Sequence, residues 1–183
     1  AREIPTLQGN HDWYIATGSP CPRSRSANLC LDHQRKILTA ENLSWIKSLI
    51  PSLHEAGMNM VHGGWSDPVD EYLQPTPEYF SKLEGKIFAS GHTHVQYIWS
   101  SGGKTYCNPG SVGQPRDGDW RAAFATFSDG RFELHRVEYA VASVQQAMHV
   151  AGFDEHIYRD LSRGTRIGGQ VDHPPEGAVT GLR

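Results

Sequence analysis

The sequence lacks the cysteine pattern of a disulfide-rich or zinc-finger protein. It has only three cysteines, Cys21, Cys30 and Cys107, and no two of them have C-x-x-C spacing. Neither a disulfide scaffold nor a structural zinc site is predicted, and a reducing cytoplasmic location fits these thiols best. A metal role for Cys21 and Cys30 is an alternative, but a buried or idle thiol is the more common state.

Long apolar runs and an excess of basic residues are also missing. No segment is apolar for long enough to span a membrane, and residues 1–10 do not have the pattern of a secretion signal. The formal net charge is -3, whereas nucleic-acid-binding proteins usually carry a basic face. We therefore expect neither a membrane nor a nucleic-acid partner. The length of 183 residues instead predicts one domain with a real core.

The first half of the chain alternates short apolar segments with a helical pattern. Thr39 is a candidate N-cap for a helix from about Ala40 to about His54. The apolar stretches Met58–Val61 and 86–90 predict two buried strands. Residues 4–8 resemble the end of a strand, so the chain is expected to begin within a domain.

The second half changes to a period of two, which is typical of antiparallel hairpins. Two pairs of segments flank glycine-containing turns, namely 95–100 with 104–108, and 122–127 with 131–139. This order predicts an α/β or α+β layered domain whose chemistry lies at strand ends.

Helices and then a polar tail are expected after the hairpins. Residues 141–150 predict a helix, and residues 155–162 a second, shorter one. The segment 168–183 is rich in glycine and proline and is expected to be disordered. We therefore predict a domain over residues 1–167 with a C-terminal tail.

Three glycine-containing motifs place polar side chains where strands are expected to become loops. They are Gly9-Asn10-His11-Asp12, Val61-His62-Gly63 and Gly91-His92-Thr93-His94. Imidazole nitrogens and an amide oxygen suit divalent Mn, Fe, Co or Zn, and the adjacent glycines let the backbone turn sharply. The remaining histidines have no partner at a useful spacing and are expected to be packed or surface residues.

These motifs, in this order, resemble the calcineurin-like metallophosphoesterase family, and in particular its small bacterial and archaeal members related to diadenosine tetraphosphatases and Ser/Thr protein phosphatases. The segment Asn108-Pro109-Gly110-Ser111-Val112-Gly113 adds to the resemblance, which runs from Gly9 to about Gly164. It implies a sandwich of two mixed sheets flanked by helices, with the N-terminal strands missing. It also implies a hydrolase of phosphomonoesters, phosphodiesters or dinucleoside polyphosphates.

The resemblance further implies two divalent metal ions, with Mn as the first choice and Fe, Zn, Co or Ni as alternatives. In the family pattern Asn10, His62 and His92 match the ligands of one metal, and His94 matches a ligand of the other. His11 matches the residue that protonates or stabilises the leaving group, and Asp12 the carboxylate that orients it.

Four residues of the following loop are candidates for binding the substrate: Asn108, Gly110, Ser111 and Arg116. A plain turn is an equal alternative for the first three, and a solvated side chain is the more common state for the arginine. The aromatic residues near the motifs, Trp13, Tyr14, Trp65 and Tyr72, pack in a core or stack on a nucleobase. A small phosphorylated substrate, with a nucleotide as one candidate, is the expected partner.

The sequence also departs from the family pattern. The family has an Asp-x-His motif and a bridging aspartate in a Gly-Asp motif, and both are expected before Gly9, where this sequence has neither. An alternative interpretation is therefore a truncated, non-catalytic metal-binding or assembly domain of the same fold. A sheet without its first strands exposes a hydrogen-bonding edge, which favours aggregation or a homo-oligomer. The net charge argues against a nuclease.

Overall fold

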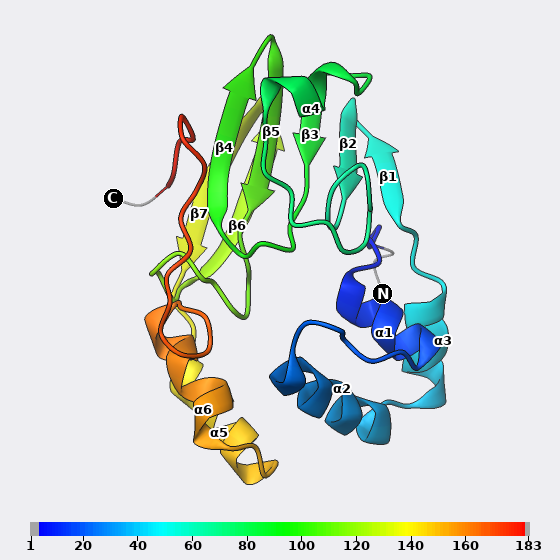
Figure 1. The fold of residues 1–183 in the computed structure, drawn as a ribbon, viewed down its shortest axis with the longest axis vertical. Helices are drawn as coiled ribbons and strands as arrows, with labels where there is room; N and C mark the ends of the chain where they lie inside the picture. Colours follow the sequence, from blue (N-terminus) through cyan, green and yellow to red (C-terminus); the bar gives the residue numbers. More distant parts are fainter. Residues whose placement is uncertain (1–3, 182–183) are drawn as a thin grey trace.

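The computed structural model describes residues 4–181, and its centre is a five-stranded mixed sheet. The strands are β1 (Ser52–Glu55), β2 (Met58–Val61), β3 (Ile87–Ala89), β4 (Gln96–Ser101) and β5 (Lys104–Pro109), in the spatial order β1-β2-β3-β5-β4. β2, β3 and β5 run parallel, and the edge strands β1 and β4 run antiparallel to their neighbours. The loops that follow β2 and β3 therefore leave the sheet at the same end (Figure 1).

The second sheet is a hairpin of β6 (Ala122–Ser128) and β7 (Arg131–Val137). Its turn residues Asp129 and Gly130 have φ values of 50° and 75°, which suit a two-residue turn between twisted strands. Both predicted hairpins are confirmed, and so is the α/β fold class of sheets flanked by helices. Of the two sheets expected, the larger is mixed and the smaller is antiparallel.

A buried polar network joins the two sheets. The Gln96 side chain is almost fully buried, and its Nε2 donates hydrogen bonds to the carbonyl oxygens of Phe124 and His135, each at 3.0 Å. Its Oε1 accepts a hydrogen bond from Arg136 Nε at 2.8 Å, and Arg136 forms a buried ion pair with Asp117. These contacts fix the position of the hairpin against β4, although Asp117 Oδ1 is buried without a hydrogen-bond partner among the described residues.

The helices form two groups at the end of the sheets opposite α4 (Pro77–Ser81), as Figure 1 shows. The first group is α1 (Asn10–Thr17), α2 (Arg25–Ile37) and α3 (Ala40–Lys47). The second is α5 (Val141–Val150), α6 (Glu155–Tyr158) and the 3₁₀ helix η1 (Arg159–Arg163). Across residues 4–181 no helix is both long enough and apolar enough to cross a membrane. Helices α1, α2 and α4 were not predicted.

The helix predicted from Ala40 to about His54 is wrong in its second half. The helix ends at Lys47, and residues 52–55 form β1, in which Leu53 pairs with Met60. Pro51 separates the two elements because proline lacks a backbone N–H donor. The apolar spacing that suggested a longer helix continues across this proline by coincidence.

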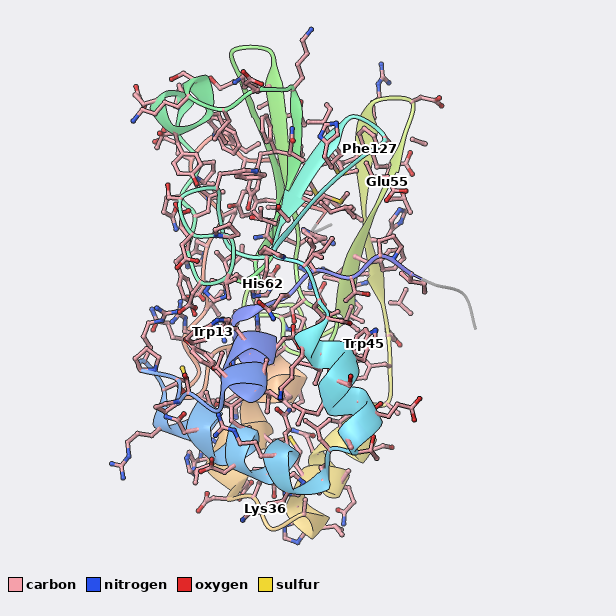
Figure 2. All side chains as sticks on the ribbon, turned by 90° about the vertical axis from the view of Figure 1, so that its right-hand side faces the viewer. Trp13, Lys36, Trp45, Glu55, His62 and Phe127 are labelled. Carbon is pink, nitrogen blue, oxygen red and sulfur yellow. The ribbon has the colours of Figure 1, made fainter. Side chains whose placement is uncertain are left out.

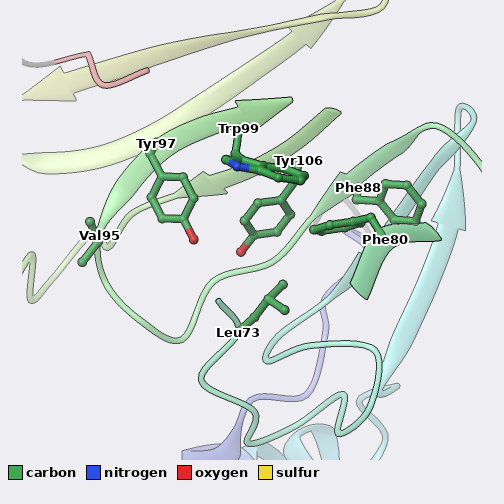
Figure 3. Close-up of a cluster of buried hydrophobic side chains, with 7 residues drawn as sticks. All are labelled: Leu73, Phe80, Phe88, Val95, Tyr97, Trp99 and Tyr106. Carbon is green, nitrogen blue, oxygen red and sulfur yellow. The ribbon is translucent and has the colours of Figure 1, made fainter. Parts of the chain in front are cut away.

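Two clusters of buried side chains make up the core. The larger lies on one face of the five-stranded sheet, under α4, and Figure 3 shows its members: Leu73, Phe80, Phe88, Val95, Tyr97, Trp99 and Tyr106. Tyr97 and Trp99 are two apart on β4, so they point to the same face. The smaller cluster packs α1, α2 and α3 together through Tyr14, Ile15, Cys21, Leu31 and Ile46.

The N-terminal segment makes little sheet structure. Residues 4–8 were expected to be the end of a strand, and Leu7 forms an isolated parallel bridge with Ile50. The Gln8 N–H group donates a hydrogen bond to the Ile50 carbonyl at 2.8 Å. This bridge leads the chain into α1; residues 1–3 lie outside the described part.

The C-terminal segment differs from the expected disordered tail. Val179 and Ile98 exchange two backbone hydrogen bonds of 2.8 Å, so residues near 179 lie along β4. Arg166 Nε donates to both carboxylate oxygens of Asp172 at 2.7 Å. Residues 168–181 thus follow a defined path, because backbone pairing and an ion pair compensate for the low apolar content. The domain boundary at residue 167 stays a prediction, and residues 182–183 lie outside the described range.

Candidate functional site

Three polar side chains from separate segments meet where the strands give way to the helices. Asn10 begins α1, His62 follows β2, and His92 lies in the loop after β3. His62 Nε2 lies 3.2 Å from Asn10 Oδ1 and 3.1 Å from His92 Nδ1. Figure 2 shows His62 at the boundary between the strands and the helices. The structure therefore brings together the three residues that the sequence assigned to one metal ion.

Gly9 allows α1 to approach His62 this closely. A Cβ atom added to Gly9 would lie 3.0 Å from Cε1 of the His62 ring, which is closer than ordinary van der Waals contact. Gly9 is also the N-cap of α1, so the motif from Gly9 to Asp12 begins a helix instead of a loop. A side chain at this position would require the His62 ring or α1 to shift.

Asp12 and His11 take different positions from those the resemblance implied. Asp12 Oδ2 accepts a hydrogen bond from the Gly9 N–H group at 2.8 Å and so caps the helix. No hydrogen bond joins Asp12 to His11 among the described residues. His11 faces a cleft, burial lowers its pKa, and the charge of Asp12 opposes this shift. Asp12 therefore acts on His11 through charge, without orienting its ring by a hydrogen bond.

Both histidines of the Gly-His-Thr-His motif have an unusual backbone conformation. His92 and His94 have φ values of 66° and 63°, a left-handed region that costs residues with side chains about 1–3 kcal/mol each. The fully buried Asn108 holds the loop from behind, because its Nδ2 donates to the Gly91 carbonyl at 2.8 Å and to Thr93 Oγ1 at 3.0 Å. Asn108 thus supports the loop, a different role from the predicted substrate contact.

The tautomer of His94 follows from one hydrogen bond. His94 Nδ1 lies 2.7 Å from the carbonyl oxygen of Gln114, which can only accept, so Nδ1 carries the proton. In a neutral ring Nε2 then has a free lone pair. Such a bond on one ring nitrogen is typical of histidines that bind metal through the other. No hydrogen bond joins the His94 ring to Asn10, His62 or His92 among residues 4–181, and its assignment to a second metal stays a prediction.

The histidines are held in their neutral form, as metal ligation requires. Burial is the main cause: it lowers the pKa of His94 to about 3 and that of His92 to about 4, and it lowers the pKa of His62. The nearby charge of Arg116 acts in the same direction on His94 and His92. The ring nitrogens therefore keep their lone pairs at neutral pH.

Asp70 is a member of this site that the sequence analysis did not identify. Its Oδ1 lies 3.4 Å from His92 Nε2, and its Oδ2 accepts a hydrogen bond from the Tyr14 hydroxyl at 2.9 Å. Arg23 forms an ion pair with the same carboxylate. Asp70 connects α1 and the segment before α2 to the back of the His92 ring. Its position after Asp67-Pro68 gave no periodic or motif signal, so only the fold reveals it.

The loop that contains Gly110 and Ser111 is tied to the histidine loop. Ser111 Oγ accepts a hydrogen bond from the Gln114 N–H group at 3.0 Å, and the Arg116 N–H group donates to the His94 carbonyl at 3.0 Å. Gly110 has a φ of 84°, and a Cβ atom there would lie 2.7 Å from the Cβ of Ala123. These two residues shape the loop and so position Arg116.

Arg116 carries charge into the site and has no carboxylate partner among residues 4–181. Its Nη2 donates to Gln114 Oε1 at 3.3 Å, and its Nε is buried without a hydrogen-bond partner. A guanidinium group in this state can donate two parallel hydrogen bonds to two oxygens of one phosphate group. Of the four predicted substrate-binding residues, Arg116 alone lines the cleft.

The cleft beside these residues has a volume of about 780 Å³. Its polar side includes Asn10, His11, Gln114 and Arg116. Of the four aromatic residues near the motifs, Tyr72 lines the cleft and lies 4.2 Å from the His92 ring between ring centroids. Trp65 and Tyr14 pack in the two cores, as the alternative interpretation expected, and Trp13 is partly exposed.

The donor set fits one divalent metal ion in composition. Two neutral imidazole nitrogens and an amide oxygen converge, and such ligands suit borderline metals. Among residues 4–181, no group of three or more histidine, cysteine, aspartate or glutamate side chains is placed to hold a metal ion. The site therefore depends on the amide of Asn10 as its third ligand.

Comparisons with known proteins identify the family. The family model described as the calcineurin-like phosphoesterase superfamily domain matches residues 1–130. A crystal structure of a metallophosphoesterase from Sphaerobacter thermophilus superposes with a TM-score of 0.76 at 31% identity, over 87% of this chain and 76% of that one. The hypothetical protein PH1004 from Pyrococcus horikoshii has a TM-score of 0.80 at 17% identity, over 91% and 75%, a likeness of fold alone.

A curated relative, the uncharacterized protein MJ0912 of Methanocaldococcus jannaschii, is 28% identical over 161 residues. The match covers 74% of this chain and 65% of the relative, so the chain spans about two thirds of that protein's length. Together these findings show that the chain belongs to the calcineurin-like phosphoesterase superfamily, whose members generally use divalent metal ions.

Proposed function

We propose that the protein hydrolyses phosphate esters with a dinuclear metal centre, of which Asn10, His62 and His92 hold one ion and His94 contributes to the other. The observation that carries this proposal is the convergence of Asn10 Oδ1 and His92 Nδ1 on His62 Nε2, at 3.2 and 3.1 Å. Mn is the proposed metal, with Fe, Zn, Co and Ni as alternatives, because the donors are borderline in softness.

Bound metal ions would supply a water molecule of lowered pKa and would neutralise charge on the phosphate. The chain's own residues do the rest. Arg116 has no carboxylate partner among the described residues, and it binds a phosphate oxygen. His11 faces the same cleft and donates a proton to the departing oxygen, a role that typically contributes about 10²–10⁴ in rate. Asp12 stabilises the charged form of His11 through its own charge.

The proposed substrates are phosphomonoesters, phosphodiesters or dinucleoside polyphosphates, and the family membership supports the reaction class. The test uses the full-length protein with p-nitrophenyl phosphate and bis-p-nitrophenyl phosphate in saturating Mn. We expect metal-dependent release of nitrophenol, lost in Asn10→Ala and His92→Ala and kept in His156→Ala, a half-exposed histidine far along the chain. No release from either ester with any of the five metals would overturn the proposal.

A second candidate is a metal-binding or assembly domain of the same fold without hydrolytic activity. It is favoured by the donor set itself, which draws its third ligand from an amide because residues 4–181 offer no third histidine or carboxylate to the pair His62 and His92. The same assay separates the two candidates, because metal binding without turnover of either ester would support the second.

A further inference from the structure

We infer that the cleft selects a phosphate ester with one phosphate group and an uncharged apolar or aromatic alcohol part of about nucleoside size. This inference rests on the proposed function and adds the class of substrate. Its basis is the wall of the cleft that faces away from the histidines, to which neither the metal ligands nor His11 contribute.

The cleft has two chemically different sides. Asn10, His11 and Arg116 form the end next to the metal ligands. The opposite wall comes from the second group of helices and the segment after it. Arg166 lies on this wall with its guanidinium paired to Asp172, and the other members are apolar: Val144, Met148, Ile157, Leu161 and Ile167. Val144 and Met148 are four apart on α5, so they share one face of that helix. A ligand that spans the cleft therefore meets charge at one end and hydrocarbon at the other.

Several apolar side chains of this cleft are left open to solvent. Val144 is 40% exposed, Ile167 38% and Tyr72 41%, although each is large enough to gain from burial. Exposed apolar groups scattered singly are ordinary, whereas a group of them that lines one concave surface marks a binding site. A ligand with an apolar part would remove this surface from water.

The volume of the cleft points to an organic substrate. Small-molecule sites usually have volumes of about 300–1,000 Å³ and mostly apolar linings. The cleft, at about 780 Å³, lies within this range. A phosphate group at Arg116 and His11 fills only the polar end, so the remaining space belongs to the alcohol part of the ester.

The charges of the cleft limit the number of phosphate groups. Three arginines line it, but Arg23 is paired with Asp70, and Arg166 donates to both oxygens of Asp172 at 2.7 Å. Arg116 has no ion pair among residues 4–181. One uncompensated guanidinium matches one phosphate group, and a polyphosphate chain would leave charges without partners along an apolar wall. This favours a monoester or diester over a dinucleoside polyphosphate.

The test measures binding and turnover in the full-length protein. Binding compares phenylphosphonate with methylphosphonate, which share a head group and differ only in the apolar part, by calorimetry in Mn. Turnover compares p-nitrophenyl phosphate with glycerol phosphate. The variants are Val144→Trp and Met148→Trp, which fill the apolar wall, and the matched control is Val150→Trp on the same helix. Val150 is 76% exposed and lies outside the cleft.

We expect wild type to bind phenylphosphonate at least about tenfold more tightly than methylphosphonate. Both cleft variants should remove this preference and lower the ratio of kcat/KM for the aryl ester over glycerol phosphate by about tenfold or more. Val150→Trp should change neither by more than about twofold. Equal binding of the two phosphonates, binding of neither, or a ratio unchanged in both cleft variants would overturn the inference.

The same measurements distinguish a failure of the proposed hydrolytic function from a failure of the proposed substrate class. If no ester is hydrolysed but the preference for phenylphosphonate persists and is lost in Val144→Trp, the apolar wall is a ligand-binding site and the hydrolytic proposal is wrong. If both esters are hydrolysed without any effect of the cleft variants, the hydrolytic proposal stands and the substrate class is wrong.

Discussion

The histidine pair His62 and His92, which lies beside the cleft, differs from the cleft wall formed by α5 and η1 in how its side chains are held. His92 is 4% exposed and is approached by His62, Asp70 and Tyr72, while Asn108 fixes the loop behind it. Val144 on the wall is 40% exposed. Metal ligands must be held in a fixed geometry by their surroundings, whereas an apolar binding surface does not need a fixed geometry for each side chain. Substitutions at the two ends should therefore have very different effects.

The largest effect is expected for His62→Ala. His62 Nε2 contacts both other members of the donor set, so its removal leaves Asn10 and His92 without a common centre. We expect metal-dependent turnover of p-nitrophenyl phosphate to fall by more than about 100-fold, since even residues behind metal ligands cost about 10–100-fold. Steady-state kinetics check this, with His54→Ala on the exposed strand β1 as control. Equal losses in the two variants would contradict the assignment.

A smaller but clear effect is expected for Asp70→Asn. The substitution keeps the shape of the side chain but removes its charge beside His92 Nε2. Mn affinity should fall by about 10–100-fold, as for other carboxylates behind a histidine ligand. Calorimetric titration with Mn measures this, and Asp32→Asn on the exposed side of α2 is the control. A loss of thermal stability with unchanged Mn affinity would show that Asp70 is only structural.

Gly9→Ala tests how tightly the ligand shell is packed. The new methyl group would lie about 3.0 Å from the His62 ring, so the ring or α1 must shift. A displacement of this kind should lower kcat/KM about tenfold while the protein stays folded, because small misplacements near the chemistry are costly. Circular dichroism and kinetics on the same sample distinguish misplacement from unfolding. Unchanged kinetics would mean that the shell tolerates movement.

The smallest effect is expected when Val144→Ala is tested for its effect on the free energy of unfolding. Because Val144 is already 40% exposed, its truncation should change the free energy of unfolding by less than about 1 kcal/mol. Phe80→Ala in the main core, where Phe80 is 1% exposed, should cost about 3–5 kcal/mol. Urea denaturation of both variants makes the comparison. A cost at Val144 close to that at Phe80 would mean that the wall is part of the core.

The sequence predicted the sites near the strands better than those made by packing. His62 and His92 were identified because each follows a strand, and two parallel neighbours deliver their loops to the same end of a sheet. The hairpins were predicted correctly because turn residues such as Asp129-Gly130 fix the register locally.

Features that depend on tertiary contacts were missed. α2 was missed because most of its residues are polar and Leu31 is its one buried residue, even though its apolar side chains gather on one face. The role of Asp70 was not predicted because it depends on contacts with Tyr14, Arg23 and His92, which are distant in sequence. The tail from residue 168 was expected to be disordered because its backbone pairing with β4 leaves no pattern in composition.

The most direct test of the central claim is a count of bound Mn ions by electron paramagnetic resonance in the full-length wild type and in His62→Ala. The proposed dinuclear centre predicts two tightly bound ions in the wild type and the loss of one in the variant, since His62 joins Asn10 and His92 around a single ion. The same number of ions bound with the same affinity in both proteins would contradict the assignment of these three residues to a metal site.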